Sequence, residues 1–347
     1  MREIMAVTGR ATTRRLMLFG ILAISSALVF LVTTRPTREN PRDVTGHRRI
    51  MNVAKNDERE TFDNRGNITM DDNGKYVVKW DPNGKTWQLW KDNPSAACSQ
   101  YRTRFALGLP RTYLVSFPGS GNTWTRYLLE AASGIFTGAV YRDQEILKAG
   151  HLGEADAPDS GRTLVQKTHG TAIVSMKNTM KNRYEVIRAD LPCILIIRNP
   201  ARSIVSFWKY YKLKGKDRHT KQLPEASFQT QDFRNFVVKM TTLWEQLISD
   251  RLLWSSAPIH VVYYEQLVQD PIFYVKEMLE FLRIPIDDGR LQCLEDHLQG
   301  SFKRPNKKET DPYSGEEKLA LSYAVKRVKR LLRIMGYAEM PVYGELS

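Results

Sequence analysis

A short loop between a strand-like run and a helix-like run constrains this chain most. Residues 112–117 are a β-branched and aromatic run, residues 124–132 suit a helix, and Pro118-Gly-Ser-Gly-Asn-Thr123 joins them. Glycines let backbone N–H groups approach an anion, and the positive end of a helix dipole favours negative charge. The sequence therefore predicts a phosphate-binding turn. The competing interpretation is an ordinary Gly- and Ser-containing turn.

The same loop differs from the loops that bind ATP or GTP. Those loops end in Gly-Lys-Ser/Thr, and Asn122 stands where the lysine would be. This difference disfavours a P-loop kinase or GTPase. The candidate phosphate ligands of the loop are Ser120, Gly121, Asn122, Thr123 and Trp124.

A second stretch has the features of another ligand-binding edge. Residues 193–197 form an apolar run typical of a buried parallel strand, and Pro200 is suited to open a helix. Arg198 then follows the strand and Ser206 lies on the helix. Ligands of open α/β sheets bind at the carboxyl ends of the strands. Two such edges predict an α/β fold, a P-loop-like parallel sheet flanked by helices, although Arg198 alone could simply begin an amphipathic helix.

Taken together, these residues resemble the sulfotransferases that use 3'-phosphoadenosine 5'-phosphosulfate (PAPS). Residues 118–124 resemble the family's 5'-phosphosulfate loop, and Arg198-Asn-Pro with Ser206 resembles its 3'-phosphate motif. The resemblance extends over about 110–336. Further similar segments are Lys167-Thr-His169, the late strand and turn at 261–271, and the basic loop Phe302-Lys-Arg-Pro305. The wording of the first loop is closest to the sulfotransferase domain of WSC-domain-containing proteins, whose Cys-rich WSC modules are not present in this sequence.

The resemblance implies sulfuryl transfer from PAPS to a hydroxyl, with no metal required. It implies that His169 is the general base, because a neutral imidazole suits that role near neutral pH. Asp143 or Glu145 is the competing base, since Golgi relatives commonly place an acidic residue after the first helix. The first loop would hold the 5' side of the cofactor, and the 3' phosphate would be held by Arg198, Ser206, Lys303 and Arg304.

One departure from the family concerns Gly119, where the family loop usually carries a cation that bridges the phosphate and the sulfuryl group. A cation placed where negative charge develops is often a large catalytic contribution. Lys167 and Arg126 are the candidate substitutes, and Arg126 could instead pair with an acidic neighbour. An inactive, glycan-binding sulfotransferase fold is the alternative function.

The N-terminal region predicts a membrane anchor. Residues 16–34 are a 19-residue run without charge, long enough to cross a bilayer, and a cleaved signal peptide is the competing interpretation. Arginines flank both ends, so charge alone does not orient the span. Asn67-Ile-Thr69 is a glycosylation acceptor sequence. We therefore expect a cytoplasmic tail at 1–15, a signal anchor at 16–34, and a single-pass type II Golgi membrane glycoprotein with a lumenal catalytic domain.

The remaining boundaries follow from composition and turn signals. Residues 35–75 are polar and predict a flexible stem. Residues 76–109 predict a hairpin and lead-in, with strands at 76–80 and 86–90 and a turn at Asn83-Gly84. Its three tryptophans pack against the main domain or form a glycan-stacking surface. A sulfotransferase domain at 110–336 and a C-terminal tail at 337–347 complete the expected organisation.

Charge and cysteine content restrict the partners. The net charge of +14 suits an anionic nucleotide and an acidic glycan or glycoconjugate acceptor, and no nucleic-acid motif accompanies it. Tyrosine and lipid hydroxyls remain alternative acceptors. The three cysteines have no zinc-type spacing. Cys193 falls in a predicted buried strand, which leaves Cys98 and Cys293 as a candidate lumenal disulfide.

Overall fold

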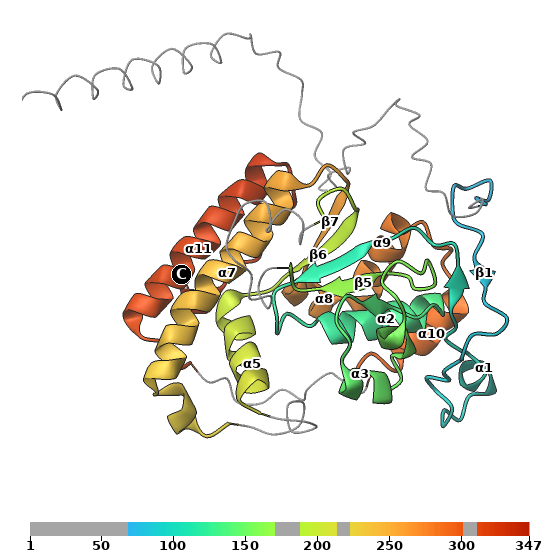
Figure 1. Ribbon diagram of the computed structural model, residues 1–347, viewed down its shortest axis with the longest axis horizontal. Helices are drawn as coiled ribbons and strands as arrows, with labels where there is room; N and C mark the ends of the chain where they lie inside the picture. Colours follow the sequence, from blue (N-terminus) through green and yellow to red (C-terminus); the bar gives the residue numbers. More distant parts are fainter. Residues whose placement is uncertain (1–68, 171–187, 214–222, 301–310, 347) are drawn as a thin grey trace, which may run out of the picture. The chain divides into compact units, whose positions relative to one another are not determined.

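The computed structural model describes residues 69–170, 188–213, 223–300 and 311–346, which all belong to one compact unit, Asp63–Ser347. The centre of this unit is a five-stranded parallel sheet with the order β4-β5-β3-β6-β7 (Figure 1). The strands are β3 (Tyr113–Ser116), β4 (Gly138–Ala139), β5 (Gln166–Thr168), β6 (Cys193–Ile197) and β7 (Ile259–Tyr263).

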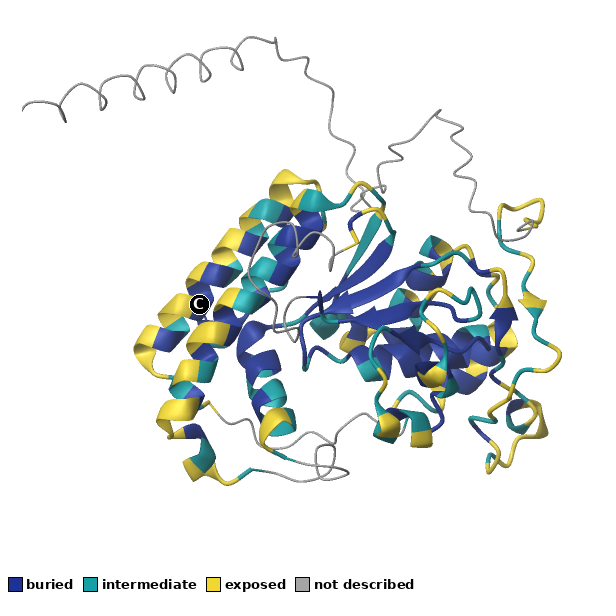
Figure 2. Cartoon of the chain, viewed as in Figure 1, coloured by how far each residue is buried: buried dark blue, intermediate teal, exposed yellow. Residues whose placement is uncertain are grey.

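Helices cover both faces of the sheet (Figure 1). One face packs against α2 (Asn122–Ser133), α9 (Pro271–Phe281) and α10 (Asp288–Glu295), and the other against α5 (Pro200–Lys212), α7 (Gln231–Trp254) and α11 (Gly315–Ile334). Side chains of a strand alternate between the two cores, as with Leu114 on the α2 side and Val115 on the α7 side. Figure 2 shows that β3 and β6 are buried along their length while β7, at the edge of the sheet, is partly exposed and the outer helices bury one side. The predicted α/β fold with a helix-flanked parallel sheet is confirmed.

Short elements fill the edges of the unit. The remaining strands are β1 (Lys79–Trp80) and β2 (Ala106–Leu107). The remaining helical segments are α1 (Ala96–Ser99), α3 (Gln144–Lys148), η1 (Leu152–Ala155), η3 (Glu225–Phe228), α8 (Tyr264–Gln269) and η4 (Gly344–Leu346).

The second predicted ligand edge has the expected local structure. The apolar run at 193–197 is β6, and Pro200 is the first residue of α5. The Asn199 side chain caps that helix by accepting a hydrogen bond from the Ala201 N–H at 2.9 Å. Cys193 is fully buried, and burial raises the pKa of its thiol to about 11, so it is a packed thiol as expected.

The predicted hairpin at 76–90 is wrong. β1 pairs antiparallel with β2, with Trp80 opposite Ala106, and Trp87 forms a bridge with Thr103 instead of with the first strand. The Asp81 side chain explains part of this outcome, because it pairs with Arg162 at 2.6 Å and so draws the turn toward the main domain. Trp90 is buried in the core, as the packing interpretation expects, whereas Trp87 is partly exposed.

Two expected boundaries shift. The last residues of the predicted stem, 69–75, form a turn at the edge of the domain, where Met70 bridges Tyr76 and Lys75 pairs with Glu280. The predicted C-terminal tail at 337–347 also packs on the domain through residue 346. It buries Met340, Tyr343 and Leu346 against the α7 and α11 side of the core, because apolar side chains are spaced along it.

The candidate disulfide between Cys98 and Cys293 is present and joins α1 to α10. Several sequence predictions lie outside the described residues: the tail at 1–15, the span at 16–34, the stem up to residue 68 with the acceptor Asn67, and the basic pair Lys303 and Arg304. Over the described ranges, no helix combines the length and apolarity needed to cross a bilayer.

Candidate active site

The phosphate loop after β3 is pressed against two helices. Gly119 and Gly121 both have positive φ angles, of 80° and 84°. A Cβ on Gly119 would lie 2.5 Å from the Ser203 carbonyl oxygen of α5, and one on Gly121 would lie 2.3 Å from the Tyr264 ring of α8. Both positions therefore require glycine for conformation and for space. In this packing, position 119 has no room for the longer side chain of a cation.

The two predicted phosphate motifs meet at this loop. The Arg198 guanidinium donates through Nη1 to the Gly119 carbonyl at 2.6 Å and lies 4.4 Å from the centroid of the Tyr264 ring. Ser206 lies beside the same glycine: a Cβ built on Gly119 would be 3.0 Å from the Ser206 Cβ. Residues 79 positions apart in the chain thus form one wall.

Buried donors in this wall lack partners. Ser120 is 1% exposed, and among the described residues neither its Oγ nor the Arg198 Nε has a hydrogen-bond partner. A buried polar group without a partner costs free energy, about 1–3 kcal/mol, unless a ligand supplies the missing bond. An anionic phosphate would satisfy both groups. The site therefore fits the phosphates of the cofactor implied by the sequence.

The other loop residues contribute in different ways. Asn122 and Thr123 begin α2, where the first N–H groups of a helix have no carbonyl one turn earlier. The Asn122 side chain faces inward and donates to the Ser116 Oγ at 3.1 Å. The Trp124 indole is buried and donates to the Leu298 carbonyl at 2.7 Å, so its ring is engaged in packing.

His169 directly follows β5, and its imidazole is held in the neutral form. Its Nδ1 lies 2.8 Å from the Ser116 carbonyl oxygen, which can only accept, so Nδ1 carries the proton and Nε2 has the lone pair. The Tyr141 ring stacks on the imidazole at 6.0 Å, and the Tyr141 hydroxyl accepts from the His169 backbone N–H at 2.6 Å. Burial and the nearby Lys167 cation lower the pKa of His169 to about 3.

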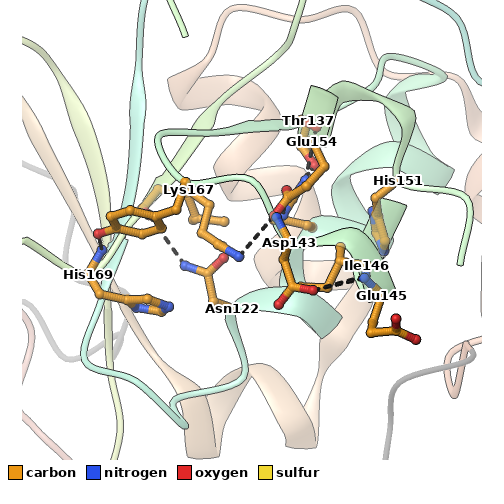
Figure 3. A network of polar contacts seen from close by, with 12 residues as sticks. Asn122, Thr137, Asp143, Glu145, Ile146, His151, Glu154, Lys167 and His169 are labelled. Carbon is orange, nitrogen blue, oxygen red and sulfur yellow. Dashed lines mark hydrogen bonds and ion pairs between the residues drawn. The ribbon is translucent and has the colours of Figure 1, made fainter. Parts of the chain in front are cut away.

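The competing carboxylates have structural partners. Asp143 caps α3 by accepting from the Glu145 N–H at 3.0 Å, and it also accepts from the Tyr210 hydroxyl at 3.2 Å. Glu145 pairs with Lys148 at 3.1 Å on the surface of the same short helix. Asp143 nevertheless lies beside the buried polar network described next, as Figure 3 shows.

Lys167 and Arg126 share one carboxylate that the sequence did not identify. Glu154 accepts from Arg126 Nη1 at 2.7 Å and from Lys167 Nζ at 3.3 Å, and Arg126 is fully buried (Figure 3 shows the Glu154 to Lys167 contact). Burial first, and then the Arg126 charge, lower the pKa of Lys167. Arg126 therefore pairs with an acidic neighbour, which was one of the two expectations for it. Lys167 lies on β5, two residues before His169. No local pattern marks Glu154, because η1 approaches β5 only in the folded chain.

The network extends behind Arg126. The Arg126 Nε donates to the Thr137 Oγ1 at 2.7 Å, and Glu130 accepts from the Thr137 N–H and from His151 Nδ1, both at 2.9 Å. Burial opposes ionisation of Glu130, yet the charges of His151 and Arg126 hold its pKa below the usual value. Such a fully connected set of bonds fixes α2 relative to the strands on either side.

Comparison with known proteins agrees with this geometry. The sulfotransferase domain family matches residues 109–330, so the chain belongs to the sulfotransferase family. It is 30% identical to a WSCD family member of Aedes aegypti over 249 residues, which are 69% of this chain and 71% of that protein. A WSCD family member of Drosophila pseudoobscura pseudoobscura is 31% identical over 212 residues, 58% of this chain and 60% of that protein. Within the sulfotransferases, the chain is thus of the WSCD type.

Solved structures with a similar fold include mouse sulfotransferase SULT7A1 complexed with PAP and the sulfotransferase domain from the curacin biosynthetic pathway. The first has 14% identity and a TM-score of 0.36 over 64% of this chain and 85% of its own. The second has 19% identity and a TM-score of 0.37 over 67% of this chain and 99% of its own.

Proposed function

We propose that this protein transfers a sulfuryl group from PAPS to a hydroxyl of a glycan or glycoconjugate. The observation that carries the proposal is the junction of Gly119, Arg198 and Ser206, beside which the Ser120 Oγ and the Arg198 Nε have no hydrogen-bond partner in the part of the chain that the structure describes. A site with buried, fixed donors and no acidic side chain among these residues favours a phosphate-bearing ligand. The family's chemistry is the transfer of a sulfuryl group.

The residues of the chain have separate tasks in this reaction. Ser120 and the N–H groups of the first turn of α2 would hold the 5' side, while Arg198 and Ser206 would hold the 3' phosphate. PAPS supplies the sulfuryl group when bound. His169 would take the acceptor hydroxyl proton on Nε2 as the acceptor oxygen bonds to sulfur and the bond from sulfur to the phosphate oxygen breaks.

Lys167 is proposed as the cation that replaces the missing one at Gly119. It lies on β5, and its ammonium is held by Glu154 in a buried setting where a charge acts strongly on its neighbours. Arg126 is the less suitable substitute, because its guanidinium is 0% exposed and bonds to both Glu154, at 2.7 Å, and Thr137, whereas Lys167 is 6% exposed and lies 3.3 Å from Glu154.

Nucleotide binding and transfer provide the first test. The full chain should be stabilised against heat by 3'-phosphoadenosine 5'-phosphate far more than by AMP, because only the former carries the 3' phosphate. Equal stabilisation by the two nucleotides would remove the basis for assigning Arg198 and Ser206. Labelled sulfate from PAPS, offered with glycans, glycolipids and peptides, should then appear on a glycan. Nucleotide binding without transfer to any acceptor would favour the inactive glycan-binding alternative.

Substitutions separate binding from chemistry. Arg198→Ala should weaken nucleotide binding, since its contact exists before and during transfer. Lys167→Ala should lower turnover on the order of 10²-fold with a smaller effect on nucleotide affinity. Lys167→Met, which keeps most of the side-chain volume, controls for packing. If both Lys167 variants and His169→Ala keep near wild-type turnover, Arg126 with Asp143 or Glu145 becomes the set to test.

We further propose that the protein is a type II Golgi membrane protein with a lumenal catalytic domain. The uncharged run at 16–34, the acceptor sequence at Asn67 and the Cys98 to Cys293 disulfide support this location, because disulfides persist in oxidising compartments. Glycosidase treatment should reduce the apparent mass of the protein from secretory cells, and Asn67→Gln should abolish that change. Digestion of the whole domain by protease added outside sealed microsomes would show the opposite orientation.

A further inference from the structure

A cavity of about 670 Å³ lies at the opposite end of α2 from the phosphate loop. Its wall includes Ser133, the last residue of α2, whereas Asn122 at the loop is the first, so the two regions are separated by about 16 Å at about 1.5 Å per residue. The volume is in the range of cavities that bind small ligands. The side chains that decide its chemistry are Trp80, Tyr101, Arg102, Arg104, Asp287 and Arg290.

Two arginines of this cavity, Arg102 and Arg104, have no carboxylate partner within the described ranges. The Arg104 guanidinium lies 4.0 Å from the centroid of the Trp80 ring. Both arginines lie near the carboxyl-terminal end of α2, whose dipole favours positive charge there. Two guanidinium groups therefore keep hydrogen-bond donors for a ligand.

The acidic side chains of the same wall are already engaged. Asp287 caps α10 by accepting from the Arg290 N–H at 3.0 Å. Asp71 accepts from the backbone N–H groups of Asn73 at 3.0 Å and Lys75 at 2.8 Å. Asp287 also pairs with the Arg290 side chain at 3.7 Å. Both carboxylates stay charged, and neither is at ion-pair distance from Arg102 or Arg104, so the wall keeps a positive excess at these two arginines.

The wall is also rigid. The disulfide joins Cys98, just before Tyr101 and Arg102, to Cys293 of α10. The Arg290 guanidinium lies over the Tyr101 ring at 4.6 Å and donates to the Arg102 carbonyl at 2.6 Å and to the Ala131 carbonyl at 3.2 Å. A wall fixed in this way loses little conformational entropy when a ligand binds.

We propose that this cavity binds an acidic saccharide, with its carboxylate or sulfate on Arg102 and Arg104 and its ring against the aromatic wall. Guanidinium groups pair with planar or tetrahedral oxyanions through two parallel hydrogen bonds, and aromatic side chains offer a flat apolar surface with a polar rim. A lipid chain would leave the guanidinium groups unpaired, and a neutral sugar would leave them with water alone. This site is independent of the sulfuryl-transfer proposal and is separate from the phosphate loop.

Calorimetric titration of the full chain with a defined sulfated, uronic-acid-containing tetrasaccharide tests the proposal. We expect the acidic tetrasaccharide to bind, a neutral tetrasaccharide of N-acetylglucosamine not to bind, and saturating 3'-phosphoadenosine 5'-phosphate to leave the affinity unchanged. Competition by the nucleotide would place the saccharide in the active site and overturn the proposal. Lack of binding by the acidic tetrasaccharide would also overturn it, while leaving the transferase proposal intact.

Matched charge removals distinguish a built site from general attraction to a basic protein. Arg102→Ala with Arg104→Ala should weaken binding at least tenfold. Lys326→Ala with Arg330→Ala removes the same charge from the exposed side of α11 and should change the affinity little. Arg102→Glu, at an exposed position, should weaken binding without changing the thermal unfolding temperature, which keeps the test valid if the double variant folds poorly. Equal weakening by the two double variants would show non-specific attraction.

Discussion

At the scale of single residues, Gly119 is needed both for its positive φ angle and for its close contact with α5, and the two effects can be measured separately. Gly119→Ala should lower both the unfolding temperature and the affinity for 3'-phosphoadenosine 5'-phosphate, because the added methyl group meets the Ser203 carbonyl. Gly108→Ala is the matched control, since Gly108 has a similar positive φ of 74° with no atom near its Cβ. If the two variants lose equal stability and neither affects the nucleotide, the contact with α5 has no role in the site.

The protonation state of His169 makes a second residue-scale prediction. Its pKa in the folded chain is about 3, below the ordinary value of 6.5, so Nε2 stays unprotonated throughout the range above about pH 4. The turnover number should therefore show no inflection near pH 6.5 between pH 5 and 8. The low pKa also affects stability, because the folded chain favours neutral His169. This contribution to the free energy of unfolding is fully present above pH 6.5 and is lost progressively as the pH falls toward 3.

Initial-rate measurements of turnover across that pH range, with saturating substrates, check the first statement. An inflection near pH 6.5 in the wild-type chain would contradict it and would indicate a solvated imidazole. An inflection that appears only in a Tyr141→Phe variant would assign the low pKa of His169 to the packing around Tyr141. Tyr141→Phe removes the hydroxyl that bonds the His169 N–H while keeping the stacked ring.

At the scale of elements, the C-terminal segment 337–346 supports the second phosphate motif. Glu345 accepts from the Asn199 amide and from the Arg202 Nε, both at 2.7 Å, and Asn199 adjoins Arg198. Deleting residues 337–347 removes three buried apolar side chains and these contacts. We expect a lower midpoint in denaturant unfolding and weaker nucleotide binding. Truncation of one buried aromatic side chain to alanine typically costs about 3–5 kcal/mol.

Glu345→Gln is the control for the deletion. The Arg202 to Glu345 pair is about 30% exposed on both sides, so its loss should cost about 1 kcal/mol or less. A deleted chain that keeps wild-type stability and nucleotide affinity would show that the segment only covers the surface.

The sequence allowed prediction of elements whose signal is local. β6 follows from five consecutive apolar residues, and the start of α5 follows from Asn199-Pro200. The predicted hairpin at 76–90 was wrong because two short strands can each pair with any open edge, and the first of them pairs with β2 in the folded chain. The packing of the C-terminal residues 337–346 could not be predicted, because their apolar side chains are too widely spaced to indicate a helix or strand.

In the candidate site, too, residues with a local sequence signal could be predicted, and residues placed only by packing could not. Strand ends mark the loop at 118–124, Arg198 and His169, and Ser206 lies on the helix that follows one of those ends. The structure brings Arg198 and Ser206 to the loop. Glu154 could not be found. Its position depends on how η1 packs between α2 and β5, and no spacing in the sequence encodes that packing.

At the scale of the whole molecule, the disulfide closes most of the described chain into one loop. Cys98 and Cys293 are 195 residues apart, and in the chain-entropy view such a closure stabilises the folded state by about 5 kcal/mol at most. Cys98→Ala with Cys293→Ala should therefore lower the free energy of unfolding by about 2–5 kcal/mol in denaturant titrations. A reductant should destabilise the wild-type chain and leave the double variant unchanged. Equal sensitivity of both to reductant would contradict the assignment.

The packing of Gly119 against α5 also limits which substitutions this position accepts. A lysine cannot enter this position by a single substitution, because its Cβ would meet the Ser203 carbonyl in the backbone of a neighbouring helix. A cation at position 119 would therefore require a second change that moves α5 away from the loop.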